Sequence, residues 1–550
     1  MSATLTPKFL FSIDYVCWRD DCIFGWGWLF SRSKIVRHAS LMLRYDDGAT
    51  ECIRLPYGST RTDVAGSFPE VPHAAGSGFL LATRLRCKAH LETSHLLATF
   101  DDGSVEEVAL PNFPAGYTVK TGSRAHWARR IRKALGEWRR IEFKQSIDFL
   151  RRNVRTRMAR QRGHRINRAV KNTRKWHIVF DHALGGGANR YREQFVEQLN
   201  AEGVPVAVVL PDVATLTYAV HQRGAFGHDS QSYDSESNVL SALALRDIAC
   251  ITINNLVSYD EPEAMIAWVL KRKSEGVTVR VMLHDFFFVC PSFTLLDQNR
   301  KYCGVPELAR CKDCLASNST IFLSYIRDPD QTRWREAWWA LLQMADEVVA
   351  FSASTLKIAR RAYPSLDQCA IKIIPHIVDY LDGRTLSPDF NGSLVIGVVG
   401  HISVPKGAEI VREMVRIIDQ ERLDVRVVVI GSIDGALDSP SLKQTGRYDA
   451  ADLLRILEEE KVTVGFLPSV IPETFSYVTS ELIQMNLPLA VFDLGAPAER
   501  VRSYARGRVI ATVDARKALQ DIMDFHHALG GKLSDSSRSS EAMKVKFRSV

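Results

Sequence analysis

Residues 176–203, WHIVFDHALGGGANRYREQFVEQLNAEG, contain the pattern that decides the fold. The apolar run WHIVF is typical of a buried strand, and three glycines at 185–187 follow it closely. The next residues carry apolar side chains at helical spacing up to Gly203, a residue type that often ends a helix. A strand, a glycine loop and a helix in this order predict the first unit of a parallel α/β sheet.

The same alternation continues on the C-terminal side. Strands and helices follow each other until a stretch rich in turn residues, KIIPHIVDYLDGRTLSPDFNGS, and then restart with strands such as LVIGVVG, VRVVVIG, VTVGFLP and LPLAVFD. We therefore expect two consecutive doubly wound, Rossmann-like α/β domains, at 176–378 and 379–530. Ligands of such sheets bind outside the carboxyl ends of the strands.

The flanking regions have other textures. Residues 8–110 alternate apolar and polar β-forming residues between Asp-Asp-Gly and Gly/Pro turns, which predicts a β-sandwich domain within 1–115. Residues 116–175 combine apolar side chains at helical spacing with many Arg and Lys, which predicts a basic helical linker. The polar residues at 531–550 are interpreted as a flexible tail.

The positive charge of the chain is concentrated in one segment. Residues 120–175 contain 20 Lys and Arg against 3 acidic residues, a net charge of +17, whereas the remainder has 51 basic and 60 acidic residues, a net charge of −9. Such a segment can bind an anionic membrane surface or nucleic acid, or it can pack as a linker on the acidic remainder.

The overall composition, 46% hydrophobic and 24% charged, is typical of a soluble globular protein. No run approaches the ~18 apolar residues of a membrane span, and the first residues do not resemble a secretion signal. We therefore expect a cytoplasmic chain, whose ten cysteines are thiols or metal ligands rather than disulfides.

Four of these cysteines, Cys290, Cys303, Cys311 and Cys314, cluster in a strand-poor region at 286–318. The pair in CKDC can supply one side of a tetrahedral ion, although the other spacings differ from those of common zinc ribbons. We favour a structural zinc ion that holds a long loop together. Four unlinked thiols and an iron–sulfur cluster are the alternatives.

Three further features lie where strands end. The glycine loop with Gly186 and Gly187 can approach an anion closely or can be a simple tight turn. His284 and Asp285 end the strand VTVRVML and either face a ligand or are fixed by hydrogen bonds there. The loop GHISVPKG places His401 and Lys406 beside a helix N-terminus, where a lysine can neutralise a diphosphate or remain solvated.

The stretch PETFSYVTSE carries Glu473 in a loop after a strand and Glu481 in the helix that follows. We expect the helix to begin near Phe475, with Thr474 or Ser476 as its N-cap. Eight helical residues rise about 12 Å, a span that suits two contacts on one extended ligand but not one shared proton or metal ion. The alternative of a solvated charge is stronger for Glu481 than for Glu473.

These features occur in the order seen in retaining GT-B glycosyltransferases of family 4, which residues 176–530 resemble. The glycine loop, His284, the loop GHISVPKG and the Glu-x7-Glu spacing carry the resemblance, and PETFSYVTSELIQMNLPLAVFDLGAPAERV is especially similar to bacterial polysaccharide-assembly members. The N-terminal region with GWGWLF resembles an accessory module, and the insert beginning HDFF resembles one in bacterial relatives. The resemblance implies a GT-B fold, with an acceptor domain at 176–378 and a nucleotide-sugar donor domain at 379–530.

The resemblance also implies a role for each matching residue. Glu473 would hold hydroxyls of the donor sugar, Glu481 the ribose, and Lys406 the diphosphate, while His284 would lie near the reacting centre. Other donor-side residues would be Gly186, Gly187, His401, Thr474, Phe475 and Ser476, and the acceptor-side residues Asn189, Arg190 and Asp285. His401 stands where family members usually carry arginine, so diphosphate binding here depends more on Lys406 and the helix dipole.

The family course implies front-face attack by an acceptor hydroxyl, with no metal ion or other cofactor needed for the chemistry. We therefore expect a hexosyltransferase that uses a UDP-, GDP- or dTDP-linked sugar and extends a surface polysaccharide, such as O-antigen or capsule, or a lipid-linked glycan. A lipid-linked acceptor favours an anionic membrane as the partner of 120–175, at the inner face of the cell membrane, and makes nucleic acid the less favoured partner. The alternative is a glycan- or membrane-binding scaffold with a non-catalytic core.

Overall fold

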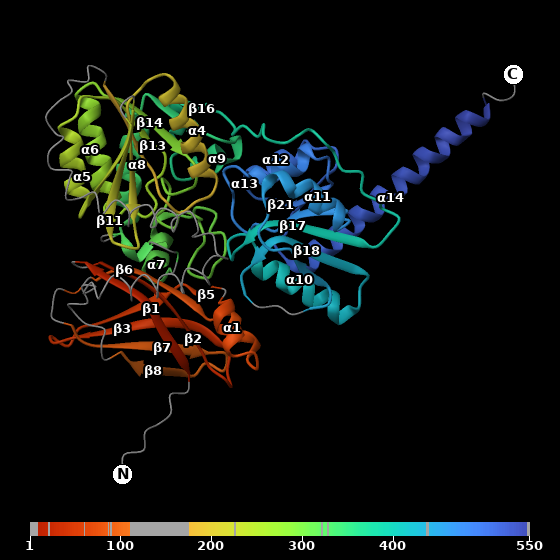
Figure 1. The fold of residues 1–550 in the computed structure, drawn as a ribbon, viewed down its shortest axis with the longest axis horizontal. Helices are drawn as coiled ribbons and strands as arrows, with labels where there is room; N and C mark the ends of the chain where they lie inside the picture. The colour runs from red at the N-terminus through yellow and green to blue at the C-terminus, as the bar shows by residue number, and fades with distance from the viewer. Residues whose placement is uncertain are drawn as a thin grey trace, which may run out of the picture. The chain divides into compact units, whose positions relative to one another are not determined.

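The computed structural model describes residues 9–110 and 175–546 apart from short gaps, at 20–21, 60, 86, 88–90, 225–226, 319, 321–322, 327–328 and 436–438. It divides into two compact units, Met1–Phe351 with Leu356–Ile374, and Ser352–Thr355 with Pro375–Val550. Figure 1 traces the chain through both units. The basic helical linker expected at 116–175 lies outside the described residues, except for Lys175.

The N-terminal region forms two four-stranded antiparallel sheets, in the strand orders β1-β2-β6-β5 and β4-β3-β7-β8. Their bounds are β1 Leu10–Arg19, β2 Cys22–Phe30, β3 Val36–Tyr45, β4 Thr50–Leu55, β5 Tyr57–Ser59, β6 Gly78–Arg84, β7 Leu91–Phe100 and β8 Val105–Ala109. A short helix α1, Thr62–Ser67, and a 3-10 turn, Pro72–Gly76, join β5 to β6.

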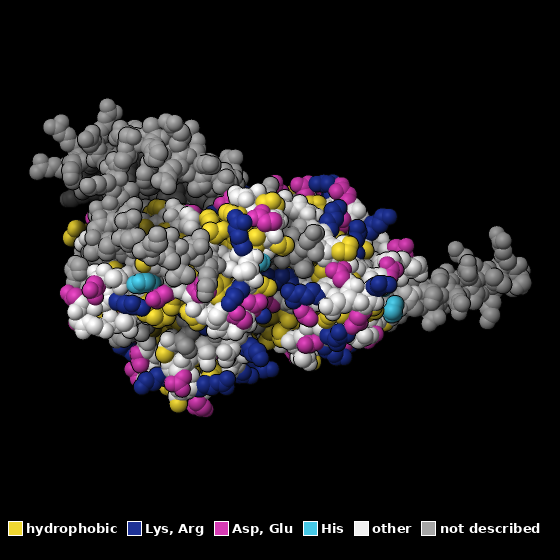
Figure 2. Space-filling view, turned by 90° about the horizontal axis from the view of Figure 1, so that it is seen from below, with side chains coloured by type: hydrophobic (Ala, Val, Ile, Leu, Met, Phe, Trp, Pro, Cys, Tyr) yellow, Lys and Arg dark blue, Asp and Glu magenta, His cyan; other side chains and the backbone are white. Residues whose placement is uncertain are grey.

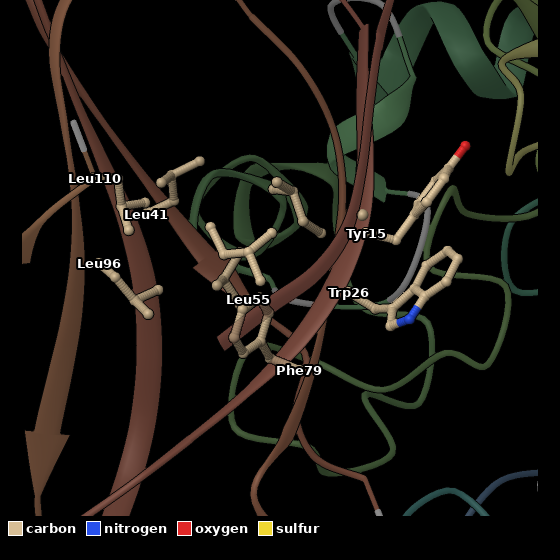
Figure 3. A pocket seen from close by; sticks show the side chains of 10 residues that line it. Tyr15, Trp26, Leu41, Leu55, Phe79, Leu96 and Leu110 are labelled. Carbon is tan, nitrogen blue, oxygen red and sulfur yellow. The ribbon is translucent and has the colours of Figure 1, made fainter. Parts of the chain in front are cut away.

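Apolar side chains from both sheets share one core in this region. Figure 3 shows Leu41, Leu55 and Leu96 on one side of a small apolar cavity, with Tyr15 and Trp26 stacked on the other side of the strand pair β1-β2. Side chains of a strand alternate between its two faces, so β2 contributes to two different cores.

The second face of the sheet β1-β2-β6-β5 packs on the α/β domain of the same unit. Phe24 belongs to the core that the α/β residues form. Tyr15 donates a hydrogen bond of 2.6 Å to the Ala214 carbonyl, and Arg84 forms a largely buried ion pair with Asp260. The N-terminal region is therefore an integral part of this unit rather than a loosely attached module.

The first α/β sheet has eight strands in the order β12-β11-β10-β9-β13-β14-β15-β16. Its strands are β9 Trp176–Phe180, β10 Val206–Asp212, β11 Thr217–Gly224, β12 Gly227–Tyr233, β13 Ile248–Ile253, β14 Thr278–Leu283, β15 Glu347–Ala350 and β16 Ile371–Ile373. The six strands from β10 to β16 pair in parallel, and β11 and β12 extend one edge in antiparallel fashion.

Helices cover both faces of this sheet (Figure 1). One face packs on α4, and the other on α5, α6 and α8. The helices are α4 Gly187–Ala201, α5 Glu236–Ala244, α6 Pro262–Ser274, α7 Leu308–Ser317, α8 Gln331–Met344 and α9 Ala353–Ala359. Burial on both faces explains why the parallel strands are almost continuously apolar in sequence.

The second α/β sheet has six parallel strands in the order β19-β18-β17-β20-β21-β22. Helices α10 and α14 cover one face, and α11, α12 and α13 the other. The strands are β17 Leu394–Ile402, β18 Val425–Ile433, β19 Leu442–Gln444, β20 Val464–Leu467, β21 Leu489–Phe492 and β22 Gly507–Ile510. The helices are α10 Ala408–Glu421, α11 Leu453–Glu459, α12 Tyr477–Gln484, α13 Gly495–Arg502 and α14 Ala515–Lys546. The expected pair of Rossmann-like sheets is thus present.

The structure corrects the expectation of a flexible tail at 531–550. Helix α14 continues to Lys546, and only 547–550 lie outside the described residues. The segment contains no proline, and extending an existing helix adds one hydrogen bond for each residue that it orders. Polar composition alone therefore misjudged this segment.

The surface of the described residues carries both signs of charge. Figure 2 shows Lys and Arg side chains interspersed with Asp and Glu over the face that it displays. Nearly all of the positive excess of the sequence lies in the segment 120–175, of which the structure describes only Lys175. Within the described part of the chain, no helix has the length and apolarity to cross a membrane.

Candidate functional site

Each α/β sheet has one point where the strand order reverses. In the first sheet β9 lies between β10 and β13, and in the second β17 lies between β18 and β20. The connections leave such neighbouring strands in opposite directions, which opens a crevice at their carboxyl ends. The loops that follow β9, β13, β17 and β20 are therefore the places to examine for ligand-binding side chains.

Close backbone packing shapes the crevice of the second sheet. Gly407 precedes α10 with a φ of 87°, and a Cβ atom there would lie 2.0 Å from the Pro468 carbonyl oxygen. The Val470 amide donates a hydrogen bond of 3.0 Å to the Pro405 carbonyl. The loops after β17 and β20 are thus joined, and only glycine fits at 407.

Lys406 and Glu473, one from each of these loops, form an ion pair of 2.8 Å between Nζ and Oε2. The side chain of Glu473 is 8% exposed and that of Lys406 is 43% exposed. The other carboxylate oxygen, Oε1, is buried and has no hydrogen-bond partner among the described residues. Because buried polar atoms normally have partners, this oxygen is available to accept a hydrogen bond from a ligand.

The backbone of Glu473 is fixed by the start of α13. The Ala496 amide donates a hydrogen bond of 2.8 Å to the Glu473 carbonyl. Gly495 has a φ of 60°, and a Cβ atom there would lie 2.5 Å from the same carbonyl oxygen. The glutamate is therefore held from both sides, by Lys406 and by the α13 backbone.

The residues after Glu473 mainly build the start of α12. Ser476 is the N-cap, and its Oγ accepts a hydrogen bond of 3.3 Å from the Thr479 amide. Phe475 packs between the His376 ring and the Arg500 guanidinium. Ser476 is thus the correct one of the two expected caps, while Phe475 has the surroundings of a packing residue.

Buried residues flank Glu481 on the same helix. Glu481 is 5% exposed and accepts a hydrogen bond from the Tyr380 hydroxyl. His376 lies nearby in sequence to Tyr380, and its Nδ1 is 3.0 Å from the Tyr477 hydroxyl. Burial lowers the pKa of His376 to about 4, so its ring is neutral near neutral pH. The segment before β17 thus packs on α12 around Glu481.

His401 lies in the last turn of strand β17 rather than in the loop where the sequence placed it. Its Nδ1 is 2.9 Å from the Ser432 hydroxyl, and its Nε2 is 3.4 Å from the Asp434 carboxylate. Both partners follow the neighbouring strand β18 or end it. The ring is therefore oriented toward β18, and Lys406 is the basic side chain that contacts Glu473.

In the first sheet, the glycine loop is supported from below by a buried polar network. Asn189 donates 2.8 Å hydrogen bonds to Asp181 and to the His182 carbonyl, and its side-chain oxygen accepts one of 2.6 Å from the Gly185 amide. Arg192 pairs with Asp181 at 2.8 Å. Asn189, expected on the acceptor side, is 4% exposed and holds the loop in place.

The loop itself has unusual backbone angles. Gly185 and Gly186 have φ values of 88° and 84°, and Gly186 is the N-cap of α4, which begins at Gly187. No side chain would clash at Gly186, so the conformation rather than space requires glycine there. Arg190 lies in the first turn of α4 and is partly buried.

His284 and Asp285 follow β14, and each is held by an asparagine that follows β13. His284 Nε2 is 2.9 Å from the Asn254 side-chain oxygen, and Asn255 donates a hydrogen bond of 2.8 Å to Asp285. The His284 ring stacks on Phe351 with centroids 4.4 Å apart. Burial raises the pKa of Asp285.

Sequence reasoning missed both asparagines. Asn254 also reaches back to the α4 helix, where it donates a hydrogen bond of 3.2 Å to the Ala188 carbonyl. Two consecutive asparagines that end the apolar strand IACITI, at the carboxyl edge of the sheet, were the available signal. Tyr380 gave no comparable signal, because its contact with Glu481 joins residues 101 positions apart.

The four clustered cysteines are free thiols. Burial raises the pKa values of Cys290, Cys303 and Cys311. Within the described ranges, no group of three or more His, Cys, Asp and Glu side chains is arranged to hold a metal ion. Asp330, considered above only as part of the strand-poor region's border, caps α8 by accepting a 2.8 Å hydrogen bond from the Arg333 amide.

Comparisons with known proteins complete this description. No protein-family model matches the chain, and no curated protein matches it. Among solved structures, it is similar to sucrose-phosphate synthase from Thermosynechococcus elongatus (13% identity, TM-score 0.40, covering 67% of this chain and 100% of that one). It is also similar to Anabaena HepE in complex with UDP (14%, 0.39, 68% and 100%) and to a glycosyltransferase from Rickettsia africae (13%, 0.41, 65% and 89%). Identities and scores this low do not bear on function, which is argued below from the side chains.

Proposed function

We propose that the chain is a retaining, nucleotide-sugar-dependent glycosyltransferase of the GT-B type. The observation that carries this proposal is the pair formed by Lys406 and Glu473 at the strand-order reversal of the second sheet. A lysine beside a helix N-terminus suits a phosphate, and a buried carboxylate with one unused oxygen suits a sugar hydroxyl. Both features occur on residues that resemble the family 4 motif.

An elongated donor fits the order of these groups along the loop and helix. In the proposal, Glu473 Oε1 accepts a hydrogen bond from a hydroxyl of the transferred sugar, and Lys406 contacts the diphosphate. Glu481, eight residues further on in α12, accepts hydrogen bonds from the ribose. Tyr380, which contacts Glu481, orients that carboxylate or gives way to the ribose when the donor binds.

The proposed chemical step needs no metal ion. The bond between the anomeric carbon and the β-phosphate oxygen breaks, and the acceptor oxygen forms its bond to the same carbon on the same face. The acceptor proton passes to an oxygen of the leaving phosphate. Lys406 and the N-terminus of α10, a 14-residue helix, stabilise the charge that develops on that phosphate.

The first sheet supplies the acceptor side in this proposal. His284 is held by Asn254 and Phe351 at the carboxyl edge, a position from which it contacts the sugar near the reacting carbon. The acceptor class proposed is a growing surface polysaccharide or a lipid-linked glycan, and the transferred unit a hexose. These finer assignments come from the resemblance of the sequence.

The test begins with a thermal-shift panel of UDP-, GDP- and dTDP-sugars on the full chain, followed by nucleotide release from the best donor. We expect Glu473→Gln and Lys406→Met each to lower kcat/KM by about 10²–10³-fold, the usual loss on removing one stabilising group. Lys443 and Glu460 form a comparable ion pair of 2.5 Å in the same unit. Lys443→Met and Glu460→Gln are therefore matched controls that should retain activity.

Two outcomes would overturn the proposal. Full activity in both Glu473→Gln and Lys406→Met would exclude this edge as the site of the reaction. Failure of the folded wild-type chain to bind any nucleotide or nucleotide sugar would favour the second hypothesis, a glycan- or membrane-binding scaffold whose core no longer catalyses transfer.

A further inference from the structure

The segment between β14 and α7 is long and almost without regular structure. From Leu283 to Leu308 it contains no helix or strand, and its one ladder contact is the isolated bridge between Leu296 and Tyr302. Leu295, Arg300 and Val305 adopt positive φ values, of 57°, 60° and 56°. Such backbone is unfavourable for these residue types and persists only where the surroundings impose it.

The thiols of Cys290, Cys303, Cys311 and Cys314 converge in this segment and the adjoining α7 helix. Each of the six pairs among them lies within the range of direct electrostatic interaction. Cys311 and Cys314 are three residues apart in α7 and therefore project from the same helix face. Residues distant in sequence are thus gathered into one sulfur-rich cluster.

Every sulfur of this cluster faces a nitrogen donor. The Val305 amide donates a hydrogen bond of 3.4 Å to Cys303, and the Asn318 amide group donates one of 3.5 Å to Cys314. The Arg335 guanidinium donates a contact of 3.9 Å to Cys311.

The remaining sulfur, that of Cys290, accepts a hydrogen bond from the Ser292 amide. Two of the four donors are therefore backbone amides two residues after the cysteine, at Cys290 and at Cys303. A neutral thiol is a weak acceptor, whereas a thiolate attracts N–H donors strongly. The cluster has the surroundings of thiolates, and hydrogen bonds of this kind orient metal ligands and balance their charge.

We propose that these four cysteines bind one Zn²⁺ ion in a structural site. A set of four thiolates matches the tetrahedral, all-sulfur coordination that zinc accepts, and it leaves no position open for catalysis. The sulfurs as they stand are not arranged to hold an ion anywhere in the described residues, so binding requires the side chains to turn toward a common centre. Binding expels the thiol protons, and the positive charges of Arg335 and Arg310 near Cys311 offset the excess negative charge.

The site would stabilise the segment that begins at His284 and Asp285. The Phe287 amide donates a hydrogen bond of 2.8 Å to Asp285, and Phe286, Phe287 and Phe288 are buried in the core. An ion bound to Cys290 therefore anchors the strand end through a short, packed connection. The inference concerns the stability of this segment and stands independently of the proposed reaction.

The metal content of the full-length wild-type chain, purified without chelators or affinity metals, is the deciding measurement. We expect about one zinc per chain by elemental analysis, release of that zinc on titration of thiols with a mercurial, and a lower unfolding temperature after removal with a strong chelator. Cobalt added to the metal-free chain should produce the visible thiolate-to-cobalt absorption of a tetrahedral sulfur site. Four thiols that react freely in a metal-free chain, disulfides found by mass spectrometry, or the visible spectrum of an iron–sulfur cluster would each overturn the proposal.

Substitutions locate the site. Cys303→Ser and Cys314→Ser should each reduce zinc content at least tenfold at a limiting zinc concentration, because each removes one of four ligands. Cys52→Ser and Cys250→Ser are matched controls, since both are free cysteines of the same unit outside the cluster. Equal zinc content in all four variants would refute the assignment, and the wild-type measurement remains decisive if a ligand variant does not fold.

Discussion

At the scale of single residues, Glu473 and Glu481 share one sequence motif but have different surroundings. Glu473 lies in a loop, pairs with Lys406 and keeps one oxygen without a partner among the described residues. Glu481 lies within α12 and accepts the Tyr380 hydroxyl. Their spacing in sequence excludes a shared proton, and their environments assign the first to a reacting group and the second to an anchor.

This difference predicts different kinetic effects for the two glutamates. Glu481→Gln should raise the KM for the donor about 10-fold or more, since hydrogen bonds to a charged group contribute about 1.5–3 kcal/mol, while kcat changes much less. Glu473→Gln should mainly lower kcat. Steady-state kinetics with the preferred donor would separate the two effects. Glu459→Gln, on an exposed residue of α11 that pairs with Arg455, is the control, and a kcat loss in Glu481→Gln as large as that in Glu473→Gln would contradict the assignment.

Residue types at strand ends were readable from the sequence, but the direction of each side chain was not. Asn189 follows the glycine loop, which suggested a ligand contact, and in the structure its amide is directed into a buried network with Asp181. His401 occupies the expected strand end, yet its partner Asp434 comes from the neighbouring strand connection. A side chain's direction depends on partners brought together by the fold, and these are distant in sequence.

At the scale of elements, turns between strands and helices position the candidate groups. Gly407 is where this is sharpest, because it combines a positive φ with contact between a would-be Cβ and the Pro468 carbonyl. Gly446, with a φ of 78°, has open space around its Cα. The two glycines share a conformation and differ in their surroundings, so they separate backbone strain from crowding.

We therefore expect Gly446→Ala to destabilise the chain by about 1–2 kcal/mol through its backbone conformation alone. Gly407→Ala should cost about 1–3 kcal/mol more, because the Cβ atom displaces the loop after β20. Gly407→Ala should also raise the KM for the donor, because that displacement separates Lys406 from Glu473. Denaturant unfolding and donor kinetics measure both effects. Equal stabilities of the two variants would show that the contact with Pro468 is relaxed at no cost.

Some elements were predictable and others were not. The caps of α12 and α8 followed from Ser476 and Asp330, since capping is a local interaction. Strands β11 and β12 were not recognised, because polar residues in HQRGAFGHDSQSYD conceal their pairing with β10. Edge strands are exposed on one side, so hydrophobic periodicity identifies them poorly.

At the scale of the whole molecule, the chain combines two parallel α/β sheets with an N-terminal pair of antiparallel sheets. The N-terminal strands pack on the first α/β sheet through Phe24 and through the ion pair of Arg84 with Asp260. The basic segment at 120–175 connects these two parts in the sequence. We propose that this segment binds an anionic membrane surface.

Flotation of the full chain with lipid vesicles tests this membrane proposal. The chain should float with vesicles containing anionic lipid at low salt, remain unbound to phosphatidylcholine vesicles, and dissociate at salt on the order of 0.5 M, where charges are strongly screened. Replacing Arg129, Arg130, Arg132 and Lys133 with Gln should weaken binding. The same change at Arg416, Lys443, Arg455 and Lys517, four basic residues of the second unit, should not. Absence of flotation at low salt would refute the proposal.

The sequence by itself determined the two α/β domains, the positions of their strand ends and the residue types found there. These properties depend on local periodicity and turn chemistry, which neighbouring residues specify. Only the tertiary structure decided which side chains meet: Lys406 with Glu473, Glu481 with Tyr380, Asn254 with His284, and four cysteines in one cluster. Such contacts join segments far apart along the chain, so they exist only once the sheets have brought their carboxyl ends together.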